Sequence, residues 1–183
     1  MHVVQTEIAD IRVISPKRFT DDRGWFEESY RHDVLAAAGI HEIFVQDNVS
    51  FSIHKGTVRG LHFQAPPSAQ AKLVRVLVGS ILDVGVDLRR SSATYGRHVA
   101  VRIDANLGQL VYLPAGFAHG FCTLESNTLV TYKVSSRYDN ACDRNLAWND
   151  PALGIDWPVS ASEAVLSAKD SIAPRLAHID AAF

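Results

Sequence analysis

The feature that most constrains the fold is a series of short β-rich segments in the middle of the chain. They span residues 43–52, 57–64, 72–78, 80–88, 97–103, 109–113, 119–125 and 128–135. Turn-forming residues such as Pro66-Pro67 and Pro114-Ala115-Gly116 separate them. Many short strands at such spacing indicate a closed barrel or a double-sheet jelly roll rather than alternating strands and helices. We therefore expect an all-β fold.

Regular structure is sparser toward the two ends. The pattern predicts an early strand or edge segment within residues 1–15, a strand at 25–30, a short helix at 32–38 and capped helical turns beginning at Ser160 and Ser167. No repeat, linker or low-complexity tract divides the 183 residues, so a single domain over residues 1–183 is expected.

Composition excludes several classes of protein. A net charge of −2 gives no general attraction to nucleic acid or to anionic membranes. The chain has neither a secretory signal pattern nor an apolar run near ~18 residues, the usual length of a membrane helix. The two cysteines, Cys122 and Cys142, have no metal-binding or redox spacing and favour a reducing compartment. A cytoplasmic protein is predicted.

The stretch 56–72, GTVRGLHFQAPPSAQAK, carries the most reactive set of side chains. Arg59 offers an anion clamp, His62 a base that titrates near neutral pH, and Lys72 a compact cation. Strand alternation places Arg59 and His62 on opposite faces, so they share a pocket only if the strand bulges. Gly60, between them, is where a bulge is tolerated.

Two polar side chains fall on apolar faces of predicted strands. Lys72 is in phase with the valines at 74, 76 and 78, and Tyr132 is in phase with those at 130 and 134. Buried polar groups are costly, so these positions indicate function. With His62 as base, Lys72 facing an enolate oxygen and Tyr132 as a second proton donor, the set suits proton abstraction next to a carbonyl.

Other interpretations of the same residues stay open. His62 taken alone also fits a buried, hydrogen-bonded histidine, and a base needs a carboxylate partner that spacing does not select. The candidates for that partner are Asp83, Asp87, Asp143 and Asp170. Taken singly, several side chains fit the solvated surface: Arg23, Arg59 and His119. Others fit the hydrophobic core: Trp25, Phe26, Tyr138, Trp148 and the thiol of Cys122.

The spacing of glycines and histidines in 56–62 and 108–119 resembles the paired cupin motifs. Such motifs commonly build a metal site from His-x-His, a Glu and a later His. Here Gln64 stands where the second histidine is expected, and no carboxylate lies between Gln64 and Gly79. His62 and His119 are too few for a metal centre, so no metal is expected.

A wider set of motifs resembles the dTDP-4-dehydrorhamnose 3,5-epimerases of deoxysugar nucleotide biosynthesis, nearly from end to end. The motifs are Asp22-Arg23-Gly24-x-Phe26-x-Glu28, Gln46-Asp47-Asn48, Gly56-x-x-Arg59-Gly60-Leu61-His62, Gln70-Ala71-Lys72-Leu73-Val74-Arg75, Pro114-x-Gly116-Phe117-Ala118-His119-Gly120-Phe121, Tyr132-Lys133, Asp150-Pro151, Gly154-Ile155-x-Trp157-Pro158 and Ser167-x-Lys169-Asp170.

This resemblance implies a cupin-type jelly-roll isomerase that is a homodimer and uses neither a metal nor an organic cofactor. It implies inversion at C3 and C5 of dTDP-4-dehydro-6-deoxy-D-glucose, through an enolate, to give dTDP-4-dehydro-L-rhamnose. An epimerase acting at one carbon of a related dTDP-4-keto-deoxysugar is an alternative. A non-catalytic cupin that binds a sugar nucleotide is another, although it gives no reason for Lys72 and Tyr132 on apolar faces.

The resemblance also assigns roles. It implies that His62 is the base, held by Asp170, that Tyr132 is the acid, and that Lys72 supports the enolate. The substrate-binding set that it implies is Arg23, Phe26, Glu28, Gln46, Asp47, Asn48, Arg59, Lys72, His119, Tyr138, Asp143 and Lys169. Arg23 is expected to reach the site of a neighbouring subunit. Asp143 stands where the family usually has Glu, so its side chain is one methylene shorter.

Overall fold

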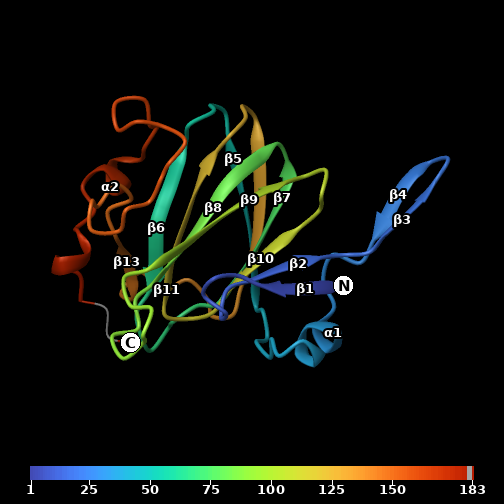
Figure 1. Ribbon diagram of the computed structural model, residues 1–183, viewed down its shortest axis with the longest axis horizontal. Helices are drawn as coiled ribbons and strands as arrows, with labels where there is room; N and C mark the ends of the chain where they lie inside the picture. The colour runs from blue at the N-terminus through green and yellow to red at the C-terminus, as the bar shows by residue number, and fades with distance from the viewer. Residues whose placement is uncertain (181–182) are drawn as a thin grey trace.

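Two antiparallel β-sheets face each other and form the body of the molecule (Figure 1). The structure is a computed structural model that describes residues 1–180 and 183. The six-stranded sheet has the order β1 (His2–Gln5), β2 (Arg12–Ser15), β10 (Leu110–Leu113), β7 (Lys72–Val78), β12 (Thr128–Val134) and β5 (Gln46–Ser52). The five-stranded sheet has the order β13 (Asp143–Asn145), β6 (Val58–Gln64), β11 (Phe117–Thr123), β8 (Ser80–Asp87) and β9 (His98–Asp104). The predicted all-β jelly roll is confirmed.

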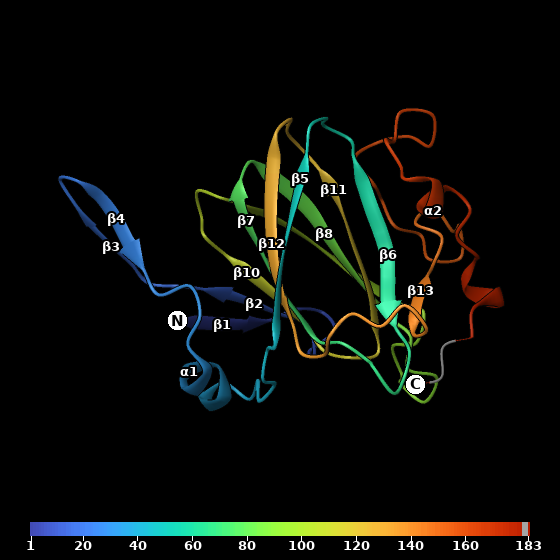
Figure 2. The same cartoon turned by 180° about the vertical axis from the view of Figure 1, so that it is seen from behind.

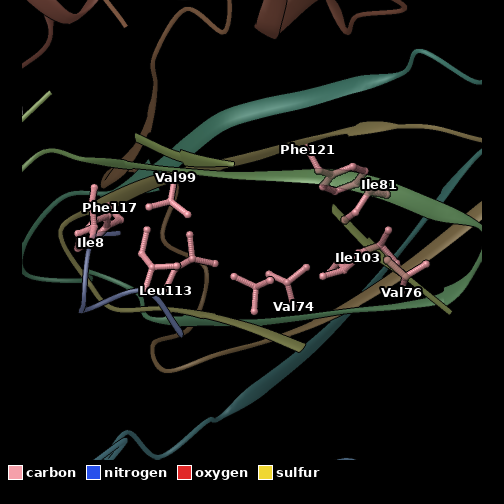
Figure 3. Close-up of a cluster of buried hydrophobic side chains, with 12 residues drawn as sticks. Ile8, Val74, Val76, Ile81, Val99, Ile103, Leu113, Phe117 and Phe121 are labelled. Carbon is pink, nitrogen blue, oxygen red and sulfur yellow. The ribbon is translucent and has the colours of Figure 1, made fainter. Parts of the chain in front are cut away.

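The main hydrophobic core fills the space between the sheets (Figure 3). Val74 and Val76 point into it from the six-stranded sheet, and Ile81 and Phe121 meet them from the other. Fully burying a side chain of this size stabilises the fold by roughly 1.5–3 kcal/mol. Alternation along β7 therefore turns Lys72 toward the same interior as Val74, because the two residues share a face.

A bulge in β6 brings Arg59 and His62 to one side. His62 pairs with His119 of β11, but Arg59 pairs with Phe121, so two residues of β6 lie opposite Gly120 alone. Gly60 has a φ of +125°, and a Cβ there would lie 2.6 Å from the Gly120 Cα. Only glycine fits this close crossing. The predicted bulge at Gly60 is confirmed.

A second irregularity corrects one expectation. Val76 pairs with Val130 of β12 and Val78 pairs with Leu129, which leaves Leu77 as an extra residue in β7. The strand therefore changes face after Val76, and Val78 is 51% exposed. The prediction that Val78 shares the inward face of Lys72 was wrong.

The hairpin of β3 (Arg18–Asp21) and β4 (Gly24–Glu27) projects from the body, next to α1 (His32–Ala37) in the chain (Figure 2). Glu27 fixes its root: Arg18 Nε donates to Glu27 Oε2 at 2.7 Å, and Arg75 of β7 binds the other oxygen. Trp25 and Phe26 are 54% and 67% exposed. Assigning these two aromatic residues to the core was wrong, because the hairpin has no second layer to cover them.

The C-terminal segment packs short turns against the five-stranded sheet. Helix α2 (Ala168–Ser171) lies beside β6 in both views (Figures 1 and 2), and the 3₁₀ turn η1 (Leu176–His178) follows. The Ser167 hydroxyl accepts the Asp170 amide at 3.1 Å, and the Ser160 amide donates to Glu163 at 3.2 Å. Both predicted caps are confirmed. Within the described residues, no helix is long and apolar enough to cross a membrane.

Candidate active site

The site lies inside the barrel, between the two sheets. A cavity of about 410 Å³ is lined by Ser50, Thr57, Val58, Arg59, His62, Lys72, His119, Phe121, Tyr132, Val165, Leu166, Ser167, Lys169 and Asp170. A neighbouring cavity of about 260 Å³ shares His62, Lys72, Tyr132 and Lys169 with it. Because the two spaces share these walls, they form one chamber. We call the space of about 410 Å³ its inner part and the space of about 260 Å³ its outer part.

His62 and Asp170 form a hydrogen-bonded pair on the five-stranded side. His62 Nε2 lies 2.5 Å from Asp170 Oδ1, and the Asp170 carboxylate is buried. Burial alone would raise the pKa of Asp170, but the His62 hydrogen bond and charge, with help from the Ser167 side chain and the Gly60 amide, hold it below its usual value. The carboxylate accepts Nε2–H, so His62 keeps the Nδ1 lone pair for chemistry.

Lys72 reaches across the interior from β7. Its ammonium donates to the main-chain carbonyl of His62 at 3.1 Å, which places the cation next to the residue that carries the base. Burial lowers the pKa of Lys72 to about 8, although the charges of Asp83 and Asp143 oppose the shift. A buried ammonium of this kind is well suited to stabilise a developing oxyanion.

Tyr132 lies on β12, in the sheet opposite the one that carries His62. Its ring packs against the edge of the main core, and its phenol lines both parts of the chamber. Burial raises the pKa of Tyr132, while the Arg59 charge opposes this effect. The phenol therefore keeps its proton near neutral pH, as a proton donor must.

Arg59 and His119 are fixed by neighbouring strands. Arg59 Nε donates to Ser52 Oγ at 3.1 Å and its Nη2 donates to the Phe51 carbonyl at 2.9 Å. His119 is only 6% exposed, and its Nε2 lies 2.7 Å from Asp83 Oδ1. Assigning His119 to the solvated surface was wrong. Burial lowers its pKa, although Asp83 works against the shift.

The outer part of the chamber is lined by expected binding residues from three segments of the chain, around positions 46–48, 138–143 and 169. Tyr138 donates its amide to Gln46 at 3.1 Å, and the Gln46 side chain donates to Asn48 at 2.8 Å. Asp143 pairs with Lys169 and lies 3.3 Å from the Tyr138 hydroxyl. Tyr138 is 59% exposed, so assigning it to the core was wrong.

Four of the expected binding residues lie away from the chamber within this chain. Asp47 is on the opposite face of β5 and pairs with Lys133 at 2.8 Å. The projecting hairpin and its exit (Figure 2) carry Arg23, Phe26 and Glu28. None of these three residues lines either cavity. The Arg23 side chain is 90% exposed and bonds only Asp21 among the described residues.

Gln64, which stands where a second metal-binding histidine would be expected, has a structural role. Gln64 is buried, its amide nitrogen donates to the carbonyls of Ser68 and Arg137, and its oxygen accepts the Asp139 amide at 2.7 Å. These bonds tie two loops to β6. In the part of the chain that the structure describes, no three His, Cys, Asp or Glu side chains are grouped as a metal site.

The structure places three further polar residues in or next to the site. Ser50, Ser52 and Asp83 were not assigned to the substrate site, yet Ser50 lines the inner part and Ser52 holds Arg59. One signal was present: polar side chains alternate along β5 at positions 46, 48, 50 and 52. A strand whose inward face is polar indicates a wet interior. Two other interpretations held, because Trp148 and Cys122 pack in a core cluster.

Comparison with known proteins adds independent findings. The model of a family described as dTDP-4-dehydrorhamnose 3,5-epimerase matches residues 5–178. The enzyme of that name from Sinorhizobium fredii is 44% identical, over all of this chain and 93% of its own length.

Solved structures agree. The 3,5-epimerase from Bacillus anthracis, crystallised with TDP and PPi bound, has a TM-score of 0.92 and 46% identity, covering 95% of this chain and 98% of that one. An epimerase from Legionella pneumophila in complex with dTDP-4-keto-L-rhamnose has a TM-score of 0.93 and 39% identity, covering 98% and 94%. A 3'-monoepimerase from Streptomyces bikiniensis with dTDP-quinovose has a TM-score of 0.88 and 36% identity, covering 97% and 88%.

Proposed function

The chain belongs to the dTDP-4-dehydrorhamnose 3,5-epimerase family, and we propose that it inverts C3 and C5 of dTDP-4-dehydro-6-deoxy-D-glucose to give dTDP-4-dehydro-L-rhamnose. One observation carries this proposal: a carboxylate-backed imidazole and a phenol line one chamber from opposite sheets, with a buried ammonium beside the base. Inversion needs proton removal on one face of the sugar and proton delivery on the other.

The first step is proton abstraction next to the C4 ketone. His62 Nδ1 takes the proton from C3 or C5. The electron pair of the broken C–H bond forms a double bond to C4, and the π pair of the C4 carbonyl moves to the oxygen. The Lys72 ammonium stabilises this enolate oxygen. Asp170 stabilises the imidazolium that His62 becomes and holds its ring in place.

The second step is proton delivery from the other wall. Tyr132 gives its phenolic proton to the carbanionic carbon, and the C4 carbonyl re-forms. Solvent then returns a proton to Tyr132 and takes one from the His62 imidazolium. The ketone acidifies both neighbouring C–H groups, so one base and one acid serve two successive inversions. No electron leaves the substrate, and the chemistry calls for proton transfer alone.

Binding groups surround the reacting centre. Arg59 presents a guanidinium to the inner cavity, which suits a diphosphate oxygen, and His119 lies one strand away. Tyr138, Gln46 and Asn48 frame the outer part, where a flat base stacks well on an exposed aromatic ring. We assign these residues, with Lys169 and Asp143, to the nucleotide-sugar.

A homodimer completes the proposed site. The β3–β4 hairpin extends away from its own chamber and carries Arg23, Phe26 and Glu28, so a neighbouring chain is the place where they can meet substrate (Figure 1). The outer face of the six-stranded sheet offers a matching surface, since Val49, Phe51 and Leu77 are all exposed there.

Each chain is proposed to act as one domain. A cytoplasmic location is proposed as well, supported by two unpaired cysteines.

Deuterium exchange tests the activity. The 4-keto-6-deoxyglucose nucleotide is incubated with the protein in heavy water, and the product is examined by NMR. Deuterium at both C3 and C5 with inversion at each is the expected result. Label and inversion at one carbon would favour the single-site alternative. The similar 3'-monoepimerase is an example of such an enzyme. Binding of dTDP without exchange at either carbon would reduce the protein to a sugar-nucleotide-binding module.

A further inference from the structure

Asp83 is a buried carboxylate for which the reaction described above has no use. It lies in β8, faces the barrel interior and is 2% exposed. Its Oδ1 accepts from His119 Nε2 at 2.7 Å, while its Oδ2 is buried without a hydrogen-bond partner among the described residues. A buried, half-satisfied carboxylate costs free energy unless positive charge lies nearby.

The residues around Asp83 show that the Lys72 ammonium is the nearby positive charge. His119 pairs in register with His62, and the Lys72 ammonium rests on the His62 carbonyl at 3.1 Å. The titratable and charged groups that face Lys72 and His119 from the surrounding elements are Asp83, His62, Asp170, Tyr132, Arg59, Asp143 and Lys169.

The other two carboxylates in this group already have cationic partners. Asp170 binds His62, and Asp143 binds Lys169. Lys72 itself makes no ion pair within 4.0 Å among the described side chains. Asp83 is therefore the carboxylate whose charge is left to balance the Lys72 ammonium through space.

We infer that Asp83 is a positioning residue: its carboxylate keeps Lys72 charged inside the cavity and fixes His119 as the tautomer that bears its proton on Nε2. In that tautomer the Nδ1 of His119 carries a lone pair, so it accepts a hydrogen bond from a ligand hydroxyl. The first role rests on the proposed function, since it concerns the cation that stabilises the enolate.

The direction of the expected pH effect follows from the charges. Burial lowers the pKa of Lys72 to about 8, and the Asp83 charge is the largest effect opposing this shift. Loss of that charge lets the pKa fall further. Because only the ammonium stabilises the enolate, activity should then disappear at a lower pH. A nearby opposite charge typically moves a pKa by about one unit or more.

The test is the pH dependence of kcat for Asp83→Asn, with Asp83→Glu as the charge-retaining rescue. Asp83→Asn should move the alkaline limb of the profile down by about one pH unit, and Asp83→Glu should restore it. The matched control is Asp87→Asn, which removes another buried carboxylate of β8 whose partners Arg89, Ser92 and Thr94 lie outside the chamber. That control should leave the limb in place even if it lowers the melting temperature.

An unmoved limb in a folded Asp83→Asn protein would overturn the inference. A second measurement needs no variant: ¹⁵N NMR of the unaltered protein should show His119 with its proton on Nε2 and a bare Nδ1. The opposite tautomer would also overturn it. The two failures are distinguishable, because an unaltered protein without epimerase activity refutes the proposed function, whereas the tautomer can be measured regardless.

Discussion

Replacing Asp170 by Asn removes one negative charge from behind the base while nearly conserving side-chain size. In the unaltered protein the carboxylate lies 2.5 Å from His62 Nε2, is buried, and accepts the proton that fixes the ring orientation. An amide can instead donate to Nε2, which favours the tautomer with a proton on Nδ1. That tautomer has no lone pair to offer the substrate.

The size of the effect follows from the geometry. With charge centres about 4 Å apart and an effective dielectric constant of about 20, the carboxylate stabilises the imidazolium by about 4 kcal/mol. Each 1.36 kcal/mol is a factor of ten in rate, so kcat should fall about 10³-fold. Asp170 acts on the reaction only by stabilising the His62 imidazolium, which forms during proton abstraction. KM should therefore change far less than kcat.

The assay is steady-state epimerisation alongside deuterium uptake at C3 and C5. Both should fall together, because the variant impairs the shared abstraction step. Ser167→Ala is the matched control: it removes the cap that holds the Asp170 backbone, a loss of about 1 kcal/mol, and keeps the carboxylate. A folded Asp170→Asn protein that loses less than tenfold in kcat would refute the charge argument.

Three further predictions concern the acid, the anion clamp and metals. Tyr132→Phe should still incorporate deuterium while inversion falls by roughly 10²–10⁴, the usual contribution of a positioned acid; inversion at the normal rate would remove Tyr132 from the mechanism. Arg59→Ala should weaken dTDP binding, measured by calorimetry, by on the order of 2–5 kcal/mol, with Ser52→Ala as a milder variant that keeps the guanidinium; unchanged affinity would exclude Arg59 from the site. Exhaustive chelation should leave turnover unchanged, and restoration of lost activity by a single divalent ion would contradict that expectation.

Much of the fold could be predicted because the strands carry their own signals. The segments expected at 57–64, 72–78 and 128–135 correspond to β6 (Val58–Gln64), β7 (Lys72–Val78) and β12 (Thr128–Val134). Alternation within each strand also identified Lys72 and Tyr132 as inward residues. The extra residue Leu77 was missed, because nothing in the sequence of one strand shows where its partner slips.

The sequence did not show which side chains of the site pair with each other. His62 and Asp170 are 108 positions apart, so spacing could not choose among four aspartates, and the family resemblance had to supply the partner. Asp83 was one of those four, but it lies behind His119 instead of His62. Which carboxylate meets which imidazole depends on how the strands cross, and that is a property of the folded sheet.

The projecting β3–β4 hairpin has a genetic consequence if Arg23 of one chain enters the chamber of another (Figure 1). The two halves of each site then come from different polypeptides. A subunit lacking Arg23 and a subunit lacking His62 would each be inactive alone, yet a mixed dimer would contain one site with both residues intact. Two defective alleles co-expressed in one cell should therefore complement each other. If the two variant proteins are purified separately and then mixed, activity should appear only as fast as their subunits exchange.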